Sequence, residues 1–254
     1  MTARVFCPSL GPDDDVDQAF DSVYPDWVRC HSKRHWTPVE VAQRAAELLV
    51  TSAYTRVLDV GAGAGKFCIV GALTTHGRFC GVEQRAHLVE VAREAAEHYG
   101  ARRVRFIHGD ITSIDWREFN AFYLYNPFSE HVTGPFGAID PSITFAPAPR
   151  EMYIRFTRAQ LAAAPVGTRV VTYHGYGGRM PPGFRCARRE GRGSGFVELW
   201  IKEPTALRMP PFTGEDRGAR GRSIECALGS GDVDARRPSR SSRPARGPLD
   251  RNCG

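Results

Sequence analysis

The segment VLDVGAGAGKF, residues 57–67, is the feature that most constrains the fold of this chain of 254 residues. It opens with a short apolar run, which predicts a buried strand, and continues with glycine at positions 61, 63 and 65. A helix is predicted to begin at Lys66. Because glycine lacks a Cβ, the backbone amides of such a turn can come close to a ligand. The segment therefore predicts a strand–loop–helix unit with a binding site in its loop.

Predicted strands and helices alternate along the rest of the chain. The expected helices cover residues 38–50, 66–75, 86–99 and 150–164. The expected strands cover residues 56–60, 78–82, 104–108, 121–125, 169–173, 184–190 and 195–201. The last two strands have no helix between them, so they predict an antiparallel hairpin. The pattern predicts an α/β fold, a three-layer sandwich around a doubly wound, mostly parallel seven-stranded sheet with a C-terminal hairpin.

The helix expected over 38–50 carries a local start signal. Thr37, Pro38 and Glu40 match an N-cap, a first helical residue and a capping-box partner. In such a box the threonine hydroxyl accepts a hydrogen bond from the backbone amide of the glutamate. We therefore expect this helix to be capped by its own side chains.

Composition divides the chain into three regions. We expect an irregular acidic lead over 1–24, a folded body over 25–213 and a disordered tail over 214–254, which is rich in Gly, Arg, Ser and Pro. The tail has nine arginines against six acidic residues, so it supplies three of the six net positive charges and leaves +3 for the rest. That balance gives only weak support for a nucleic-acid partner.

Membrane and metal signals are missing from the sequence. The first residues lack the apolar core of a signal peptide, and no stretch approaches the roughly 18 apolar residues of a membrane span. We therefore expect a cytoplasmic protein with no membrane partner. Seven cysteines are scattered without a C-x-x-C pair, so we expect reduced thiols and no metal site.

Three nucleotide-binding patterns compete for the glycine loop. A P-loop requires G-x-x-x-x-G-K-[S/T], but Val60 stands in place of its first glycine and Phe67 in place of its hydroxyl residue. A dinucleotide fingerprint requires G-x-G-x-x-G or Ala, but Lys66 takes the place of the third small residue. That pattern stays as an alternative. The third pattern has an acidic residue two positions before the first glycine, and Asp59 stands there.

Two further acidic residues follow predicted strands. Glu83 ends the second strand, 22 residues after Gly61, where a carboxylate can accept hydrogen bonds from both ribose hydroxyls of a nucleoside cofactor. Asp110 follows the third strand in the run Gly109-Asp110-Ile111. Open parallel sheets bind ligands at the carboxyl ends of their strands. We therefore expect the three carboxylates to line one site.

The run from Asp59 to Gly65 resembles the glycine-rich motif of class I methyltransferases that use S-adenosylmethionine (SAM). The resemblance covers the chain from Thr37 to about Lys202, including the final hairpin. SAM has no phosphate but carries a sulfonium and an amino group, so a carboxylate beside the loop suits it and would repel a pyrophosphate. The resemblance implies SAM as the cofactor.

The same resemblance implies where each part of SAM would bind. Asp59 and the glycines are expected at the methionine portion, Glu83 at the ribose, and Asp110 with Ile111 at the adenine. A Thr-Pro element like Thr37-Pro38 lies near the methionine end in some of these enzymes. The expected cofactor-binding residues are Thr37, Asp59, Gly61, Ala62, Gly63, Gly65, Lys66, Phe67, Glu83, Gln84, Asp110 and Ile111.

A candidate acceptor element follows the fourth strand. Asn126-Pro127-Phe128 is similar to the (Asp/Asn)-Pro-Pro-(Tyr/Phe) element of amino methyltransferases but lacks its second proline. The resemblance implies that these three residues are catalytic and that Asn126 orients a nitrogen acceptor. The missing proline puts nitrogen specificity in doubt and leaves oxygen and carbon acceptors open.

Two other segments are candidates for substrate contact. The proline-rich stretch 129–149 is longer than ordinary connections and predicts a loop that covers the substrate. His174 and Tyr176 follow the fifth strand and are expected at the same rim.

The expected function is transfer of a methyl group from SAM, by in-line displacement, to an unidentified acceptor. The acceptor could be a small molecule, a protein side chain or a nucleobase. Two alternatives stay open: an NAD(P)-dependent oxidoreductase on a related sheet, and a noncatalytic RNA-binding protein that uses the basic tail.

Overall fold

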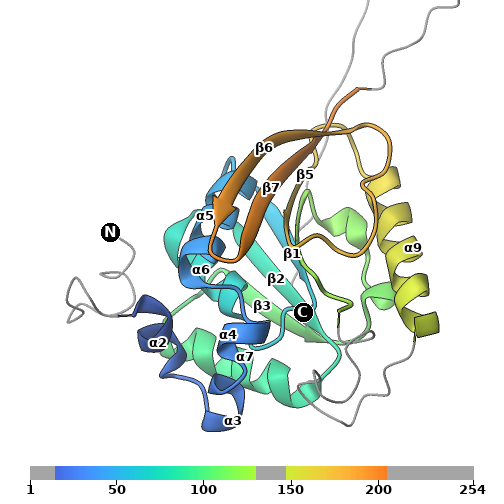
Figure 1. Ribbon diagram of the computed structural model, residues 1–254. Helices are drawn as coiled ribbons and strands as arrows, with labels where there is room; N and C mark the ends of the chain where they lie inside the picture. Colours follow the sequence, from blue (N-terminus) through green and yellow to red (C-terminus); the bar gives the residue numbers. More distant parts are fainter. Residues whose placement is uncertain (1–14, 130–146, 205–254) are drawn as a thin grey trace, which may run out of the picture. The chain divides into compact units, whose positions relative to one another are not determined.

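The computed structural model describes residues 15–129 and 147–204, all within the unit Met1–Leu207 (Figure 1). At its centre lies a seven-stranded sheet in the order β3-β2-β1-β4-β5-β7-β6. The strands are β1 (Arg56–Val60), β2 (Arg78–Glu83), β3 (Val104–His108), β4 (Ala121–Tyr125), β5 (Arg169–Tyr173), β6 (Phe184–Arg192) and β7 (Gly195–Lys202). The first five are parallel, and β7 is antiparallel to both β5 and β6. The predicted fold class is confirmed.

Helices cover both faces of this sheet. They are α2 (Val16–Asp21), α3 (Asp26–Arg29), α4 (Ser32–His35), α5 (Val39–Leu49), α6 (Lys66–Thr74), α7 (Ala86–His98) and α9 (Pro147–Ala163), with 3-10 turns η1 (Ile111–Ser113) and η2 (Trp116–Glu118). Helices α5, α6 and α7 pack on one face and α9 on the other (Figure 1).

The alternation of side chains along β1 explains why both faces are covered. Val57 is buried in the core that contains α5, α6 and α7, whereas Leu58 and Val60 are buried in the core that contains α9. Strands that bury both faces have nearly continuous apolar sequences, and β1 and β4 have that composition. The sheet therefore holds the ends of its central strands in fixed positions.

The start of α5 differs from the predicted capping box. Its N-cap is Pro38, which provides no side-chain hydrogen bond, and the helix begins at Val39. The Thr37 hydroxyl instead pairs with the Tyr123 hydroxyl at 3.0 Å, and Asp17 accepts from the Val39 amide at 2.8 Å. The predicted cap was wrong because partners distant in the sequence replaced the local hydrogen bonds.

The N-terminal lead, predicted to be irregular up to residue 24, contains α2. Asp15 caps this helix and accepts from the Asp17 amide at 2.9 Å. Lys66, at the start of α6, donates to Asp17 at 2.5 Å and to Asp21 at 2.8 Å. The prediction was wrong for Val16–Asp21 because a buried cation far along the chain fixes this segment, and composition cannot reveal such a contact.

Several predictions fall on residues outside this description, namely the start of the lead, most of the predicted substrate loop and the tail over 214–254. Within residues 15–129 and 147–204, no helix has the length and apolar character needed to cross a membrane. The same residues contain no group of three or more His, Cys, Asp or Glu side chains arranged to hold a metal ion.

Candidate active site

The glycine loop joins β1 to α6 with backbone angles that favour glycine. Gly61, Gly63 and Gly65 have φ of 76°, 54° and 80°, in the left-handed region. Gly65 is also the N-cap of α6. A Cβ on Gly63 would lie 2.3 Å from the indole ring of Trp36. A side chain at Gly63 is thus opposed both by the backbone angle and by its neighbour.

Hydrogen bonds fasten the loop to the end of β2. The amides of Gly61 and Ala62 both donate to the Val82 carbonyl at 3.0 Å. The Gly63 amide donates to the carboxylate of Glu83 at 3.1 Å. The loop and the end of the second strand therefore form one rigid unit.

Asp59 is buried near the end of β1, with 4% of its surface exposed. Its carboxyl accepts a hydrogen bond from the Cys68 thiol at 3.5 Å. Burial raises the pKa of Asp59 to about 7, the Cys68 hydrogen bond lowers it, and the Glu83 charge raises it further. This carboxyl is therefore near its titration midpoint at neutral pH, and a neighbouring cation would favour its ionised form.

Glu83, the last residue of β2, is buried, and both of its carboxylate oxygens have polar partners. One carboxylate oxygen accepts from the Gly63 amide at 3.1 Å. The other accepts from the Arg85 amide at 3.0 Å and from the Arg85 guanidinium at 3.2 Å. A buried carboxylate needs such partners because desolvation of an unpaired charge is costly. The Glu83 carboxylate is thus held directly beside the glycine loop.

Asp110 joins a hydrogen-bonded cluster after β3. One oxygen caps η1 by accepting from the Thr112 amide at 2.8 Å, and the other accepts from Gln84 at 3.1 Å and from the Tyr153 hydroxyl. Burial alone would raise the pKa of Asp110, but hydrogen bonds from Thr112 and Tyr153 hold it below its usual value. Ile111 is buried in the same core as Tyr153. Gln84, Asp110 and Ile111 are therefore brought together.

Three of the predicted cofactor residues have side chains engaged by other groups. The Lys66 ammonium is bound by the two aspartates of α2. The Phe67 ring stacks on Tyr123 with centroids 3.8 Å apart, and the Thr37 hydroxyl pairs with the same tyrosine. The backbones of Lys66 and Phe67 still form the first turn of α6, directly after the loop. Their roles in cofactor binding stay predictions.

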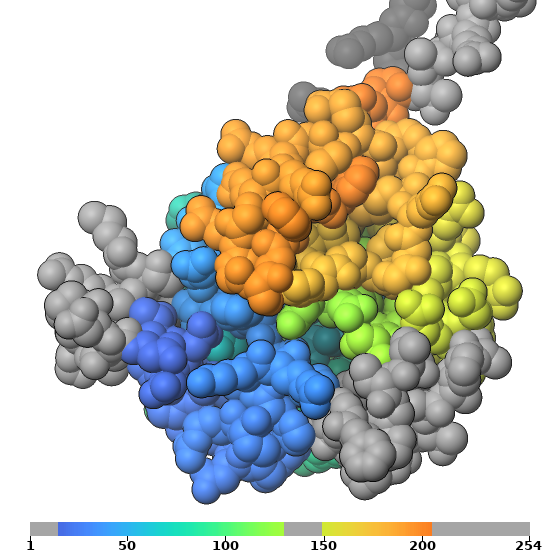
Figure 2. Space-filling model, viewed as in Figure 1, coloured from blue at the N-terminus to red at the C-terminus, as the bar shows by residue number. Residues whose placement is uncertain are grey.

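The predicted acceptor element lies between the glycine loop and Tyr153. Asn126 has φ of 41°, which is unusual for a residue other than glycine. The Pro127 Cβ lies 3.3 Å from the position that a Cβ on Gly61 would take. Phe128 is buried and stacks on Tyr153 with centroids 5.5 Å apart. Figure 2 shows the end of β4 (yellow-green) between the N-terminal helices (blue) and the hairpin (orange).

A comparison with known families agrees with this geometry. Residues 51–125 match the family model described as a methyltransferase domain, which includes the glycine loop, all three carboxylates and the whole of β4. Residues 51–125 therefore carry a methyltransferase domain, and such a domain implies SAM as its cofactor. No curated protein sequence matches the chain significantly.

A solved structure with a TM-score above 0.5 shares the fold of this methyltransferase domain. TrmN from Thermus thermophilus is 20% identical with a TM-score of 0.51, over 74% of this chain and 53% of that protein. An RNA methyltransferase from Salinibacter ruber, solved with S-adenosyl-L-homocysteine, is 23% identical with a TM-score of 0.49, over 69% of this chain and 96% of that one. At these identities the likeness concerns the fold, and the chain spans about half the length of TrmN.

The methyltransferase domain has a narrow cavity beside the glycine loop. Its volume is about 30 Å³, and its lining includes His35, Trp36, Asp59, Gly61 and Tyr125. A cavity of that size holds roughly one water. Burial, His31 and nearby arginines lower the pKa of His35 to about 4, so this imidazole is neutral at neutral pH.

The groups at this edge of the methyltransferase domain fit SAM. Carboxylates end three neighbouring strands, and the nearby cations Lys66 and Arg85 are each paired with carboxylates. The neutral His35 adds no positive charge at neutral pH. An acidic edge attracts a sulfonium and an amino group and repels a pyrophosphate. Together with the family match, this sets aside the NAD(P)-dependent alternative.

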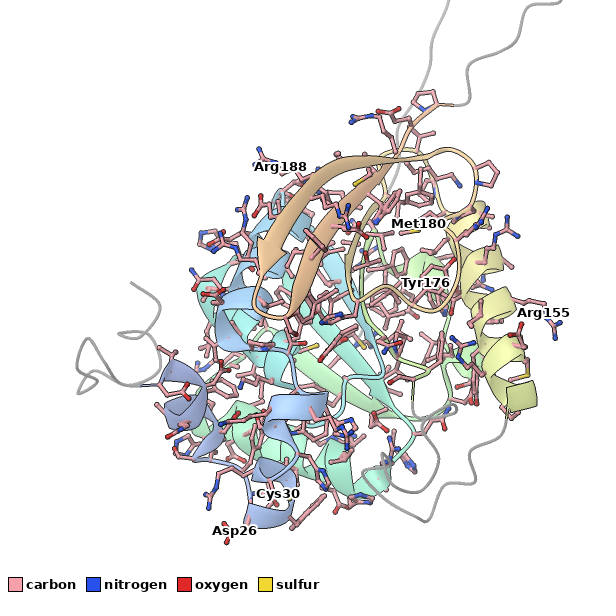
Figure 3. The ribbon with its side chains drawn as sticks, viewed as in Figure 1. Asp26, Cys30, Arg155, Tyr176, Met180 and Arg188 are labelled. Carbon is pink, nitrogen blue, oxygen red and sulfur yellow. The ribbon has the colours of Figure 1, made fainter. Side chains whose placement is uncertain are left out.

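Sequence reasoning missed Trp36 and Tyr153 and misplaced Tyr176. Trp36 carried a signal, since it directly precedes Thr37, but Tyr153 lies in an amphipathic helix without any motif. Tyr176, which is labelled in Figure 3, is 2% exposed and belongs to the core that contains residues of α9, so it presents no surface to a substrate. His174 lies beside Tyr125, with ring centroids 5.8 Å apart, and stays a candidate for substrate contact.

Proposed function

We propose that the domain methylates a nitrogen atom and that the Asn126 side chain orients this acceptor. The observation that carries the proposal is the position of Asn126-Pro127-Phe128 between the cofactor loop and Tyr153. The left-handed backbone conformation of Asn126 costs on the order of 1 kcal/mol of folding free energy. The backbone N–H of Asn126 donates to the Gly175 carbonyl at 2.8 Å. A strained residue held in place beside a ligand loop is typical of a functional position.

In this proposal the carboxyl ends of the strands hold SAM. Asp59 and the loop of Gly61, Ala62, Gly63 and Gly65 bind the methionine portion. Glu83 accepts hydrogen bonds from the ribose hydroxyls, and Asp110, which Gln84 orients, accepts from the adenine amine beside Ile111. When bound, SAM supplies an electrophilic methyl group.

A neutral nitrogen suits the groups that surround this site. It attacks without prior loss of a proton, so it needs no strong general base, and His35 with a pKa of about 4 is a weak one. Catalysis then depends on alignment and on exclusion of water, and alignment contributes on the order of 7 kcal/mol. The stacked rings of Phe128 and Tyr153 provide a wall that excludes water.

Radiolabelled SAM tests the proposed acceptor. The full chain is incubated with methyl-tritiated SAM and cell extract, and the labelled products are separated by class and identified by mass spectrometry. We expect a label on nitrogen. A label found only on oxygen or carbon would contradict the proposal.

Two variants of Asn126 separate its side chain from its backbone. Glycine adopts a φ of 41° without strain but has no side-chain amide, whereas the aspartate side chain keeps an oxygen that accepts hydrogen bonds. We expect Asn126→Gly to lower kcat by roughly 100-fold with unchanged SAM affinity, in line with loss of a strong hydrogen bond, and Asn126→Asp to retain activity. A fully active Asn126→Gly enzyme would show that the side chain does not orient the acceptor.

A further inference from the structure

The edge of the sheet opposite the glycine loop contains a larger cavity with an unusual charge. Its volume is about 750 Å³, and its lining holds five arginines and a single acidic residue, Glu118. The arginines are Arg56, Arg78, Arg102, Arg103 and Arg105. We call this feature the arginine groove. It lies where β1, β2 and β3 begin, so it is separate from the site of methyl transfer.

Strand register places three of these arginines in a row. Arg56 is the partner of Arg78 in the pairing of β1 with β2, and Arg103 directly precedes Val104, the partner of Phe79. Neighbouring strands are about 4.8 Å apart, so the row spans roughly 10 Å. Like charges at such neighbouring positions repel one another. Folding gains nothing from this repulsion, whereas a bound polyanion would relieve it.

The arginine groove keeps uncommitted positive charge. Arg103 donates to the carbonyls of Ala72 and Thr75, at 2.6 and 2.7 Å, and so caps the end of α6. Arg105 pairs with Glu118 at 3.0 Å. The exposed guanidinium groups of Arg78 and Arg102 form no hydrogen bond or ion pair with any described residue. These two are therefore available to a ligand.

An exposed aromatic residue close in sequence to Arg56 of the groove indicates the class of anion. Tyr54 is 85% exposed and lies two residues before Arg56. Asn120 fixes this segment by accepting from the Arg56 amide at 2.9 Å and donating to the Tyr54 carbonyl at 3.4 Å. Basic grooves combined with aromatic rings that stack on bases are typical of proteins that bind single-stranded nucleic acid. An inorganic polyphosphate would use the arginines but not the ring.

We propose that the arginine groove binds the phosphodiester backbone of a single-stranded nucleic acid, with Tyr54 stacking on a base. A row of roughly 10 Å meets on the order of two to three phosphates. Each β-strand is about 17 Å long, so a nucleic acid bound at the amino ends of the β-strands is anchored far from the transferred methyl group. The groove thus acts as an anchoring site and not as part of the reaction.

Fluorescence anisotropy of a labelled 12-nucleotide single-stranded RNA, measured with the full chain over a salt series, tests this proposal. We expect Arg78→Gln/Arg102→Gln to make the negative slope of log K against log salt shallower by about 1.4, because each single-strand phosphate contact contributes about 0.7 to its magnitude. The same variant should bind RNA about 25-fold more weakly at 0.1 M salt. Tyr54→Ala should weaken binding by about 5-fold or more with the slope unchanged, since stacking involves no counterion.

The matched control is Arg155→Gln/Arg158→Gln, which removes the same charge from two exposed residues of α9; Arg155 is labelled in Figure 3. This control retains the arginine-rich tail and should bind RNA like the wild type. The proposal would be overturned if the control weakened RNA binding equally, or if the wild type did not bind RNA. It would also be overturned if Tyr54→Ala bound RNA with wild-type affinity and tripolyphosphate displaced the RNA at equal phosphate concentration. Calorimetric SAM binding should be unchanged in every variant, which separates this outcome from failure of the proposed methyl transfer.

Discussion

The two edges of one sheet carry opposite charges on the same three strands. At the carboxyl ends of β1, β2 and β3 stand Asp59, Glu83 and Asp110, and the amino ends carry the arginine groove. Asp59 and Glu83 are buried and each has a polar partner, as the cost of desolvation requires. The arginines are exposed, so water can solvate them without a partner. The ends of the strands thus favour ligands of opposite sign.

The two edges should differ most in the stability lost when a glycine is replaced by alanine. Two glycines with left-handed backbones, one at each edge, allow this comparison. Gly63, at the carboxyl edge, has φ of 54° and Trp36 within 2.3 Å of a Cβ. Gly100, beside Arg102 at the amino edge, has φ of 63° and nothing within 4 Å. We expect Gly63→Ala to cost at least about 3 kcal/mol and Gly100→Ala about 1 kcal/mol. Denaturant unfolding measures both, and equal costs would contradict the close packing of the cofactor loop.

A second contrast is between a buried, paired cation beside the glycine loop and an exposed cation of the arginine groove. Lys66 is 3% exposed and bound by Asp17 and Asp21, whereas Arg78 is exposed. We expect Lys66→Met to lower the free energy of unfolding by about 3 kcal/mol, because it leaves the buried Asp21 carboxylate without its ion-pair partner. Arg78→Gln should change it by less than about 0.5 kcal/mol. Thermal unfolding checks both values, and a stable Lys66→Met protein that fails to bind SAM would instead assign this ammonium to the cofactor.

A smaller effect is expected from the titration of Asp59. Its pKa in the folded protein, about 7, lies above the usual value, so its contribution to stability is complete below about pH 4 and is lost as pH rises through 7. SAM binds the ionised form through its positive charges, so affinity should rise about tenfold between pH 6 and 8. Asp59→Asn should remove this dependence. Calorimetry at three pH values measures it, and an unchanged slope in Asp59→Asn would assign the titration to another group.

The central strands could be predicted to the residue because they are buried on both faces. The expected bounds of these strands, 56–60, 121–125 and 169–173, are those observed. Continuous apolar runs between turn residues determine such strands without help from the rest of the fold. Helix α2 could not be found in this way, because its contacts with Lys66 join segments far apart in the sequence.

The candidate site was predictable only in part for the same reason. The glycine spacing and the carboxylates that end strands are local patterns, so they indicated the cofactor edge. The Tyr153 hydroxyl on Asp110 and the Tyr123 hydroxyl on Thr37 depend on tertiary packing and left no pattern. The arginine row likewise appears only through strand register, which brings Arg56 beside Arg78.

Calorimetric titration with SAM tests whether the acidic edge of the sheet binds this cofactor. The comparison uses the wild type, Glu83→Gln and Glu118→Gln, which removes an exposed carboxylate from the opposite edge. We expect the wild type and Glu118→Gln to bind alike and Glu83→Gln to bind at least about 30-fold more weakly, since hydrogen bonds to a charged group each contribute about 1.5–3 kcal/mol. Circular dichroism at the titration temperature verifies that Glu83→Gln is folded. Absence of binding by the wild type, or wild-type affinity in Glu83→Gln, would contradict the account.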